Sequence, residues 1–177
     1  MIFENTDKNT LKLLLFFGVA KLGTVNHLSS FIDLQSKETE LKIGELVQKE
    51  LAVVIGEVEV SKGNRPRKVW SLTNNGAMMI GLKGSFLFSD NTYESSLFLA
   101  ESILANKSCR WYWLESDLEK IFPESKVDFD DLLKSSFAFG KKEDSSRVIC
   151  LSVDSENLEQ VLKNAKALDS DLSLIHI

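Results

Sequence analysis

The sequence predicts an α+β protein, in which a helical unit that ends in a β-hairpin precedes a smaller α+β module. Two observations lead to this prediction. Glu57 and Glu59 alternate with Val58 and Val60, with the period of two that is typical of a half-buried antiparallel strand. Three segments with apolar residues at helical spacing come before this strand, and helical and strand-like segments follow it. We expect residues 1–84 and 85–171 to form the two units, followed by a tail at residues 172–177.

Composition indicates an ordinary globular protein with an uneven charge. Of the 177 residues, 44% are hydrophobic and 27% are charged, which is enough for a sizeable core. The net charge of -5 divides into +2 for residues 1–84 and -7 for residues 85–177. An acidic total argues against a protein that coats nucleic acid without preference, but it permits a local basic patch.

The sequence also excludes a membrane span and favours a cytoplasmic protein. No segment approaches the roughly 20 apolar residues that a span requires, and the apolar residues 11–20 lack a basic leader and a cleavage site. Cys109 and Cys150 belong to no CxxC motif, which is typical of reduced cysteines in the cytoplasm.

Three helices are expected before the hairpin. The first covers residues 8–21, begins after the capping cluster that ends at Asp7, and ends at Gly23, where glycine suits a left-handed residue. Thr24 caps a second helix over residues 25–31, and residues 32–35 form a turn. The third helix covers residues 36–50. Its inward residues are predicted to be Leu41, Ile43, Leu46 and Val47.

The hairpin joins strands at residues 51–60 and 68–72 through a basic tip. Residues 62–68 contain Lys62, Arg65, Arg67 and Lys68 and no acid. A cationic tip of this kind suits contact with phosphate groups, and the alternative is an ordinary solvated turn. The segment from Thr73 to Gly76 then predicts the start of another short helix.

A winged helix-turn-helix consists of two helices, a tight turn, a third helix and a β-hairpin, in the order that this sequence predicts. In such proteins the third helix enters the major groove of DNA. On the third helix, we expect Lys37, Thr39, Lys42 and Lys49 to face outward. The acids Glu38, Glu40 and Glu45 weaken this helix as a DNA reader, so a solvated face remains an alternative. The predicted DNA-binding residues are therefore Lys37, Thr39, Lys42, Lys49, Lys62, Arg65, Arg67 and Lys68.

Several segments resemble one family of winged-helix proteins. These are TVNHLSSFI, IGELVQKELAVVIGEVE and RPRKVWSLTNNGAMMIG, with Leu46, Leu51 and residues 69–76 carrying the match. Over residues 8–82 the chain resembles the winged-helix domain of replication-relaxation proteins of plasmids, phages and conjugative elements, and also MarR-like and PadR-like regulators. The resemblance implies binding of double-stranded DNA that regulates transcription or the replication or transfer of a mobile element. The alternative is a winged helix that docks a protein partner without binding DNA.

The second unit is expected to follow a linker at residues 82–91. A helix at 93–105 carries an apolar stripe of Leu97, Ala100, Ile103 and Leu104, which serves either the core or a homodimer contact. The aromatic residues at 109–114 predict a strand that packs in the core rather than stacking on bases. A helix at 116–122, strands at 135–139 and 147–153 and a helix at 155–168 complete this unit.

A second alternative function comes from the C-terminal unit, which resembles a nuclease-like fold of the replication-relaxation proteins. The resemblance would make Asp131 and Asp154 acids that hold a divalent metal and activate water. Ser152 stands where that pattern has a carboxylate, and no lysine follows in the strand, so we expect no metal site, no cofactor and no enzymatic activity. With only two histidines and no GxSxG, P-loop or HExxH motif, no other catalytic group is predicted.

Residues 172–177 break with the polar segment before them and resemble the translated read-through of a sequencing adaptor. We expect this tail to be non-native and the natural chain to continue past residue 171. A genuine apolar tail strand is the alternative.

Overall fold

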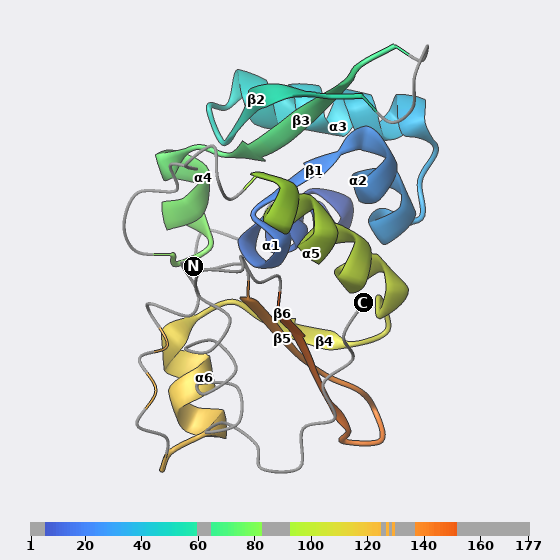
Figure 1. The fold of residues 1–177 in the computed structure, drawn as a ribbon. Helices are drawn as coiled ribbons and strands as arrows, with labels where there is room; N and C mark the ends of the chain where they lie inside the picture. The colour runs from blue at the N-terminus through green and yellow to red at the C-terminus, as the bar shows by residue number, and fades with distance from the viewer. Residues whose placement is uncertain are drawn as a thin grey trace.

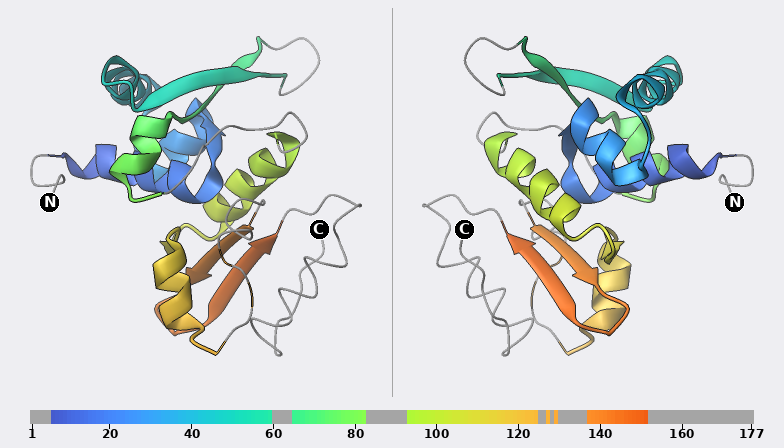
Figure 2. Two further views of the ribbon diagram at one scale, coloured as in Figure 1. Left: turned by 90° about the vertical axis from the view of Figure 1, so that its left-hand side faces the viewer. Right: turned by 90° about the vertical axis from the view of Figure 1, so that its right-hand side faces the viewer.

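The computed structural model of the chain describes residues 6–59, 65–82, 93–124, 127, 129 and 137–151. Two antiparallel three-stranded sheets lie at opposite ends of this structure, with α1, α2 and α5 between them (Figures 1 and 2). The α+β class predicted from the sequence is confirmed.

The first part of the chain places three helices before a hairpin. Its elements are α1 (Lys8–Ala20), β1 (Leu22–Thr24), α2 (Val25–Ile32), α3 (Ser36–Gln48), β2 (Ala52–Val58), β3 (Arg67–Leu72) and α4 (Asn74–Met79). The strands pair in the order β1-β3-β2, so β2 forms one edge of the sheet. Trp70 of β3 lies opposite Gly23 on one side and Val54 on the other.

Local capping explains where three of these helices begin. The Asp7 carboxylate accepts hydrogen bonds from the backbone N–H groups of Asn9 and Thr10. The Thr24 hydroxyl accepts from the N–H of His27, and the Thr73 hydroxyl accepts from the N–H of Gly76. Each side chain satisfies a backbone donor that the helix itself leaves unpaired. The predicted starts of these helices are confirmed.

The end of α1 differs from the expectation. The chain turns at Lys21, which has φ 71°, and not at Gly23. Gly23 instead belongs to β1, a strand that the sequence did not predict, and a Cβ there would lie 2.8 Å from the ring of Phe16. Glycine therefore provides space for an aromatic side chain at this position, not a left-handed turn.

The second part of the chain forms the other sheet. Its elements are α5 (Tyr93–Ala105), β4 (Arg110–Tyr112), α6 (Glu115–Ile121), β5 (Phe137–Lys141) and β6 (Arg147–Leu151), and its strands pair in the order β4-β5-β6. These agree with the expected segments to within two residues, and the expected last two residues of β6, 152 and 153, lie outside the described residues. The expected linker after residue 82, Asp131, Asp154, the helix at 155–168 and the tail fall outside the described residues.

Both faces of this second sheet are covered. Ala138 lies opposite Cys150 and joins the main core with α5, whereas Phe137 and Phe139 face α6 and pack with Leu118. Successive side chains of a strand point to opposite faces, which explains this division. The two cysteines, Cys109 and Cys150, are buried free thiols.

The helix α5 joins the two ends of the molecule. Leu99, Ala100 and Ile103 are buried in one cluster with Phe16 of α1 and residues of both sheets. Of the predicted stripe, Ala100 and Ile103 are buried in the core and Leu104 packs against it, whereas Leu97 is half-buried and Leu99, which was not predicted, is buried. His27 adds a polar link, because its Nδ1 accepts from the Thr24 N–H while its Nε2 lies 2.8 Å from the Glu101 carboxylate.

The division of the chain at residue 84 stays a prediction. The main buried cluster contains side chains from both sides of that point, so the described parts share one core. Among the helices that the structure describes, none is long and apolar enough to cross a membrane.

Candidate nucleic-acid interface

The β2–β3 hairpin segment carries four of the eight predicted contact residues. It runs beside α3 at one end of the molecule (Figure 1). Arg65, Arg67 and Lys68 are exposed, and within the described part of the chain none of them makes an ion pair. Lys62, the fourth predicted cation, falls outside the described residues. These three side chains are free to reach an anionic partner.

The hairpin separates its charges between its strands. Glu57 of β2 lies opposite Lys68 of β3, and Val58 lies opposite Arg67. Acidic residues therefore belong to β2, whereas the basic residues belong to β3 and the segment before it. Opposite charges across a strand pair stabilise the register by a few tenths of a kcal/mol.

The buried face of α3 contains one residue that we expected to be outside. Thr39, Ile43 and Leu46 are at i, i+4 and i+7 and all three are buried. The Thr39 hydroxyl donates to the Gln35 carbonyl at 3.0 Å, which satisfies its polar group inside the core. The prediction that Thr39 faces a DNA groove is wrong.

The outer face of α3 contains two residues that we expected to be inside. Leu41 is 65% exposed, because it lies on the side of the helix opposite Ile43 and Leu46, whereas Val47, four residues after Ile43, lies at the margin of the buried stripe and is 39% exposed. Next to Leu41 along the helix, a side chain at Gly44 would meet nothing within 4 Å. An open apolar spot therefore lies in the middle of this face.

Lys42 is engaged within the protein. Its Nζ lies 3.2 Å from the Asp7 carboxylate and 3.3 Å from that of Glu45, and its side chain is only 28% exposed. The hydrogen bond to Asp7 raises the pKa of Lys42. At Asp7, the hydroxyl of Thr10 is the main cause that lowers the pKa to about 2. This pair holds α3 against the start of α1, so Lys42 is not the outward, free cation that we predicted.

Two predicted cations remain exposed on α3. Lys37 is in its first turn and Lys49 follows its last residue, so roughly 18 Å of helix separates them. The exposed acids Glu38, Glu40 and Glu45 lie between them. The outer face of α3 is therefore acidic with basic ends, and the hairpin supplies the positive charge of this region.

The described residues were searched for a metal-binding group, and the chain was compared with known proteins. Among the residues that the structure describes, no three His, Cys, Asp or Glu side chains come together to hold a metal ion. Comparisons with family models, curated proteins and solved structures find no significant match to this chain.

Proposed function

We propose that this protein binds double-stranded DNA, with residues 6–82 acting as a winged helix-turn-helix. The order α1-β1-α2-α3-β2-β3 and the sheet order β1-β3-β2 support this proposal, because a winged helix-turn-helix with this order would have α3 as the second helix of its motif and the β2–β3 hairpin as its wing. The observation that carries it is that Arg65, Arg67 and Lys68 on that hairpin are exposed and make no ion pair with any residue that the structure describes.

The wing would make the main electrostatic contact. Arginine and lysine side chains neutralise phosphates and release counterions, which supplies most of the affinity that does not depend on sequence. The acids of α3 would be repelled by phosphates, so only Lys37 and Lys49 at its ends could add contacts. A protein of this kind, cytoplasmic and possessing a winged helix like that of replication-relaxation proteins, would regulate transcription or the replication or transfer of a mobile element.

A salt titration tests this proposal. The purified chain is titrated into fluorescein-labelled random duplex DNA, and anisotropy is measured from about 50 to 200 mM salt. With three wing contacts, we expect log K to fall against log salt with a slope of roughly -3. Absence of binding at 50 mM salt would contradict the proposal.

A second function, docking of a protein partner, is favoured by Leu41. An exposed leucine in the centre of an acidic helix face suits a basic partner with an apolar pocket better than it suits a DNA groove. If this face docks a protein, Leu41→Ala should abolish capture of that partner and leave DNA binding unchanged. Arg67→Glu should have the reverse pattern.

A further inference from the structure

The second sheet places three basic side chains in one row. Its register pairs Arg110 of β4 with Lys141 of β5, and Lys141 with Arg147 of β6. Residues that lie directly opposite one another point to the same face of a sheet, and neighbouring strands are about 4.8 Å apart. The three cations therefore lie side by side on one face, over a span of roughly 10 Å. All three are exposed.

This register is unfavourable for the sheet alone. Like charges that lie directly opposite each other destabilise a strand pair, and both pairs in this row are like charges. The β2–β3 hairpin has the reverse arrangement, because its register places Glu57 opposite Lys68. An anion that binds across the row would offset the repulsion between its cations.

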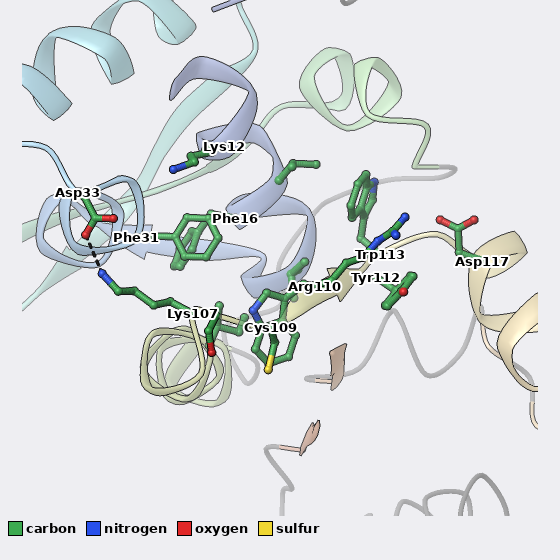
Figure 3. Close-up of a pocket in the computed structure, with 15 residues that line it drawn as sticks. Lys12, Phe16, Phe31, Asp33, Lys107, Cys109, Arg110, Tyr112, Trp113 and Asp117 are labelled. Atoms are coloured by element: carbon green, nitrogen blue, oxygen red, sulfur yellow. Dashed lines mark hydrogen bonds and ion pairs between the residues drawn. The ribbon is translucent and has the colours of Figure 1, made fainter. Parts of the chain in front are cut away.

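Aromatic rings support the two ends of the row. The Arg110 guanidinium lies 5.4 Å from the ring centre of Tyr112 (Figure 3). The Arg147 guanidinium lies 5.3 Å from the ring centre of Phe122. Between these two rings lies the buried Phe139, whose ring centre is 5.7 Å from the first and 5.1 Å from the second. Contact with the rings restricts both guanidinium groups, so they lose less conformational entropy when they bind a ligand.

The described acids near the row are engaged with other groups. The Asp144 carboxylate accepts hydrogen bonds from the N–H and the hydroxyl of Ser146, at 2.8 and 2.6 Å. The Asp117 carboxylate lies 3.6 Å from the amine of a lysine in its own helix, α6. Arg110 and Lys141 make no ion pair with any residue that the structure describes. These two neighbouring cations can therefore both reach one anion.

We propose that Arg110 and Lys141 bind a diphosphate group, with Arg147 in line beside them. The two phosphates of such a group are separated by little less than the spacing of neighbouring strands. The guanidinium would bind two oxygens of one phosphate, and the Lys141 ammonium would contact the other. A row of about 10 Å suits this small anion better than the long backbone of a duplex. The inference is independent of DNA binding, because the β2–β3 hairpin lies at the opposite end of the molecule (Figure 1).

Calorimetric titration with inorganic pyrophosphate at about 50 mM salt tests the site. We expect saturable binding with a dissociation constant below about 1 mM, and about tenfold weaker binding of orthophosphate. Arg110→Gln and Lys141→Gln should each weaken pyrophosphate about tenfold. Lys142→Gln is the matched control, because Lys142 is the next cation of the same hairpin but lies near Cys109, on the face that belongs to the main core. It should change the affinity by less than about twofold.

Two further titrations identify the source of the group and separate this site from the wing. Adenosine diphosphate that binds about threefold tighter than pyrophosphate would indicate a nucleoside diphosphate, whereas equal or weaker binding would indicate the free diphosphate. The double variant Arg65→Glu and Arg67→Glu should bind pyrophosphate as the wild type does. An equal loss there would mean that pyrophosphate binds the wing, which would overturn the proposal.

A thermal measurement tests the repulsion within the row. Without ligand, Lys141→Gln should raise the unfolding midpoint by about 1 °C, because it removes a charge that faces two like charges. A lower midpoint would mean that Lys141 stabilises the sheet, and the reason for an anion site would be lost.

Backbone amide NMR then locates the ligand. Pyrophosphate should shift the resonances of residues 110, 141 and 147 most, and circular dichroism confirms that each variant is folded. No binding by the folded wild type, equal loss in the Lys142→Gln control, or shift changes at residues 65–68 in place of these three would each overturn the proposal.

Discussion

Helix α3 and the β2–β3 hairpin lie side by side, yet they offer opposite surfaces to a partner. The outer face of α3 has three acids around the exposed Leu41, whereas the exposed end of the hairpin has Arg65, Arg67 and Lys68. The helix uses its one central lysine, Lys42, to hold itself to α1. If this region binds DNA, the hairpin must therefore supply most of the favourable charge.

The first prediction sharpens the distinction between the two faces of α3. Leu46 is 1% exposed and Leu41 is 65% exposed. Leu46→Ala should lower the free energy of unfolding by about 3 kcal/mol, because it leaves a cavity in the core. Leu41→Ala should change it by less than about 0.5 kcal/mol. Urea denaturation measures both, and equal losses would mean that Leu41 is packed.

The second prediction concerns the hairpin. The double variant Arg65→Glu and Arg67→Glu should weaken binding to any duplex by about 100-fold, or roughly 2.8 kcal/mol. The slope of log K against log salt should become shallower by about 2, because two phosphate contacts are lost.

The β5–β6 hairpin provides the matched control for that variant. Lys141 and Lys142 are also exposed cations in a hairpin, but they lie on the second sheet. Lys141→Glu with Lys142→Glu makes the same change in net charge. If both double variants lose affinity equally, the loss reflects total charge and the wing has no special role.

The third prediction tests how α3 is held in place. Asp7→Ala removes the cap of α1 and the partner of Lys42, and should cost about 1 kcal/mol at pH 7. Because the pKa of Asp7 is lowered from 3.8 to about 2, its ionised form stabilises the fold above about pH 4, and that contribution is lost as the pH falls toward 2. Wild type and variant should therefore converge in stability at acid pH. A constant difference down to pH 2 would contradict this role of the charge.

The fourth and smallest effect concerns the acids of α3. Glu38→Gln with Glu40→Gln should strengthen duplex binding about threefold, because it removes repulsion near the phosphates. Glu119→Gln with Glu143→Gln removes two exposed acids elsewhere and should change affinity less. Equal gains in an anisotropy titration would place α3 away from the DNA.

Helix-capping residues and the spacing of apolar residues predicted most of the helices. The caps at Asp7, Thr24 and Thr73 depend on hydrogen bonds within three residues, and α5 has the bounds that its apolar spacing indicated. Strand β1 has only three residues, too few for a period of two to be visible. It becomes a strand only because β3 pairs with it.

The orientation of α3 was harder to predict than its existence. Leucine is usually buried and threonine is usually exposed, but Leu41 is exposed and Thr39 is buried. A prediction from hydrophobicity therefore placed these two residues on the wrong faces of α3. The ion pair between Lys42 and Asp7 joins residues 35 positions apart, and no sequence spacing indicates it. The exposure of Arg65, Arg67 and Lys68 agrees with the expectation, because a charged hairpin end needs no tertiary partner, and their contact with DNA stays a prediction.

Backbone amide NMR of the labelled protein, titrated with a random duplex at low salt, tests the proposed function most directly. We predict that the largest shift changes fall on Arg67, Lys68 and their strand partners, with smaller changes at Lys37 and Lys49 and little change at Leu41. Shift changes confined to residues 93–151, or none at all, would contradict DNA binding through the wing.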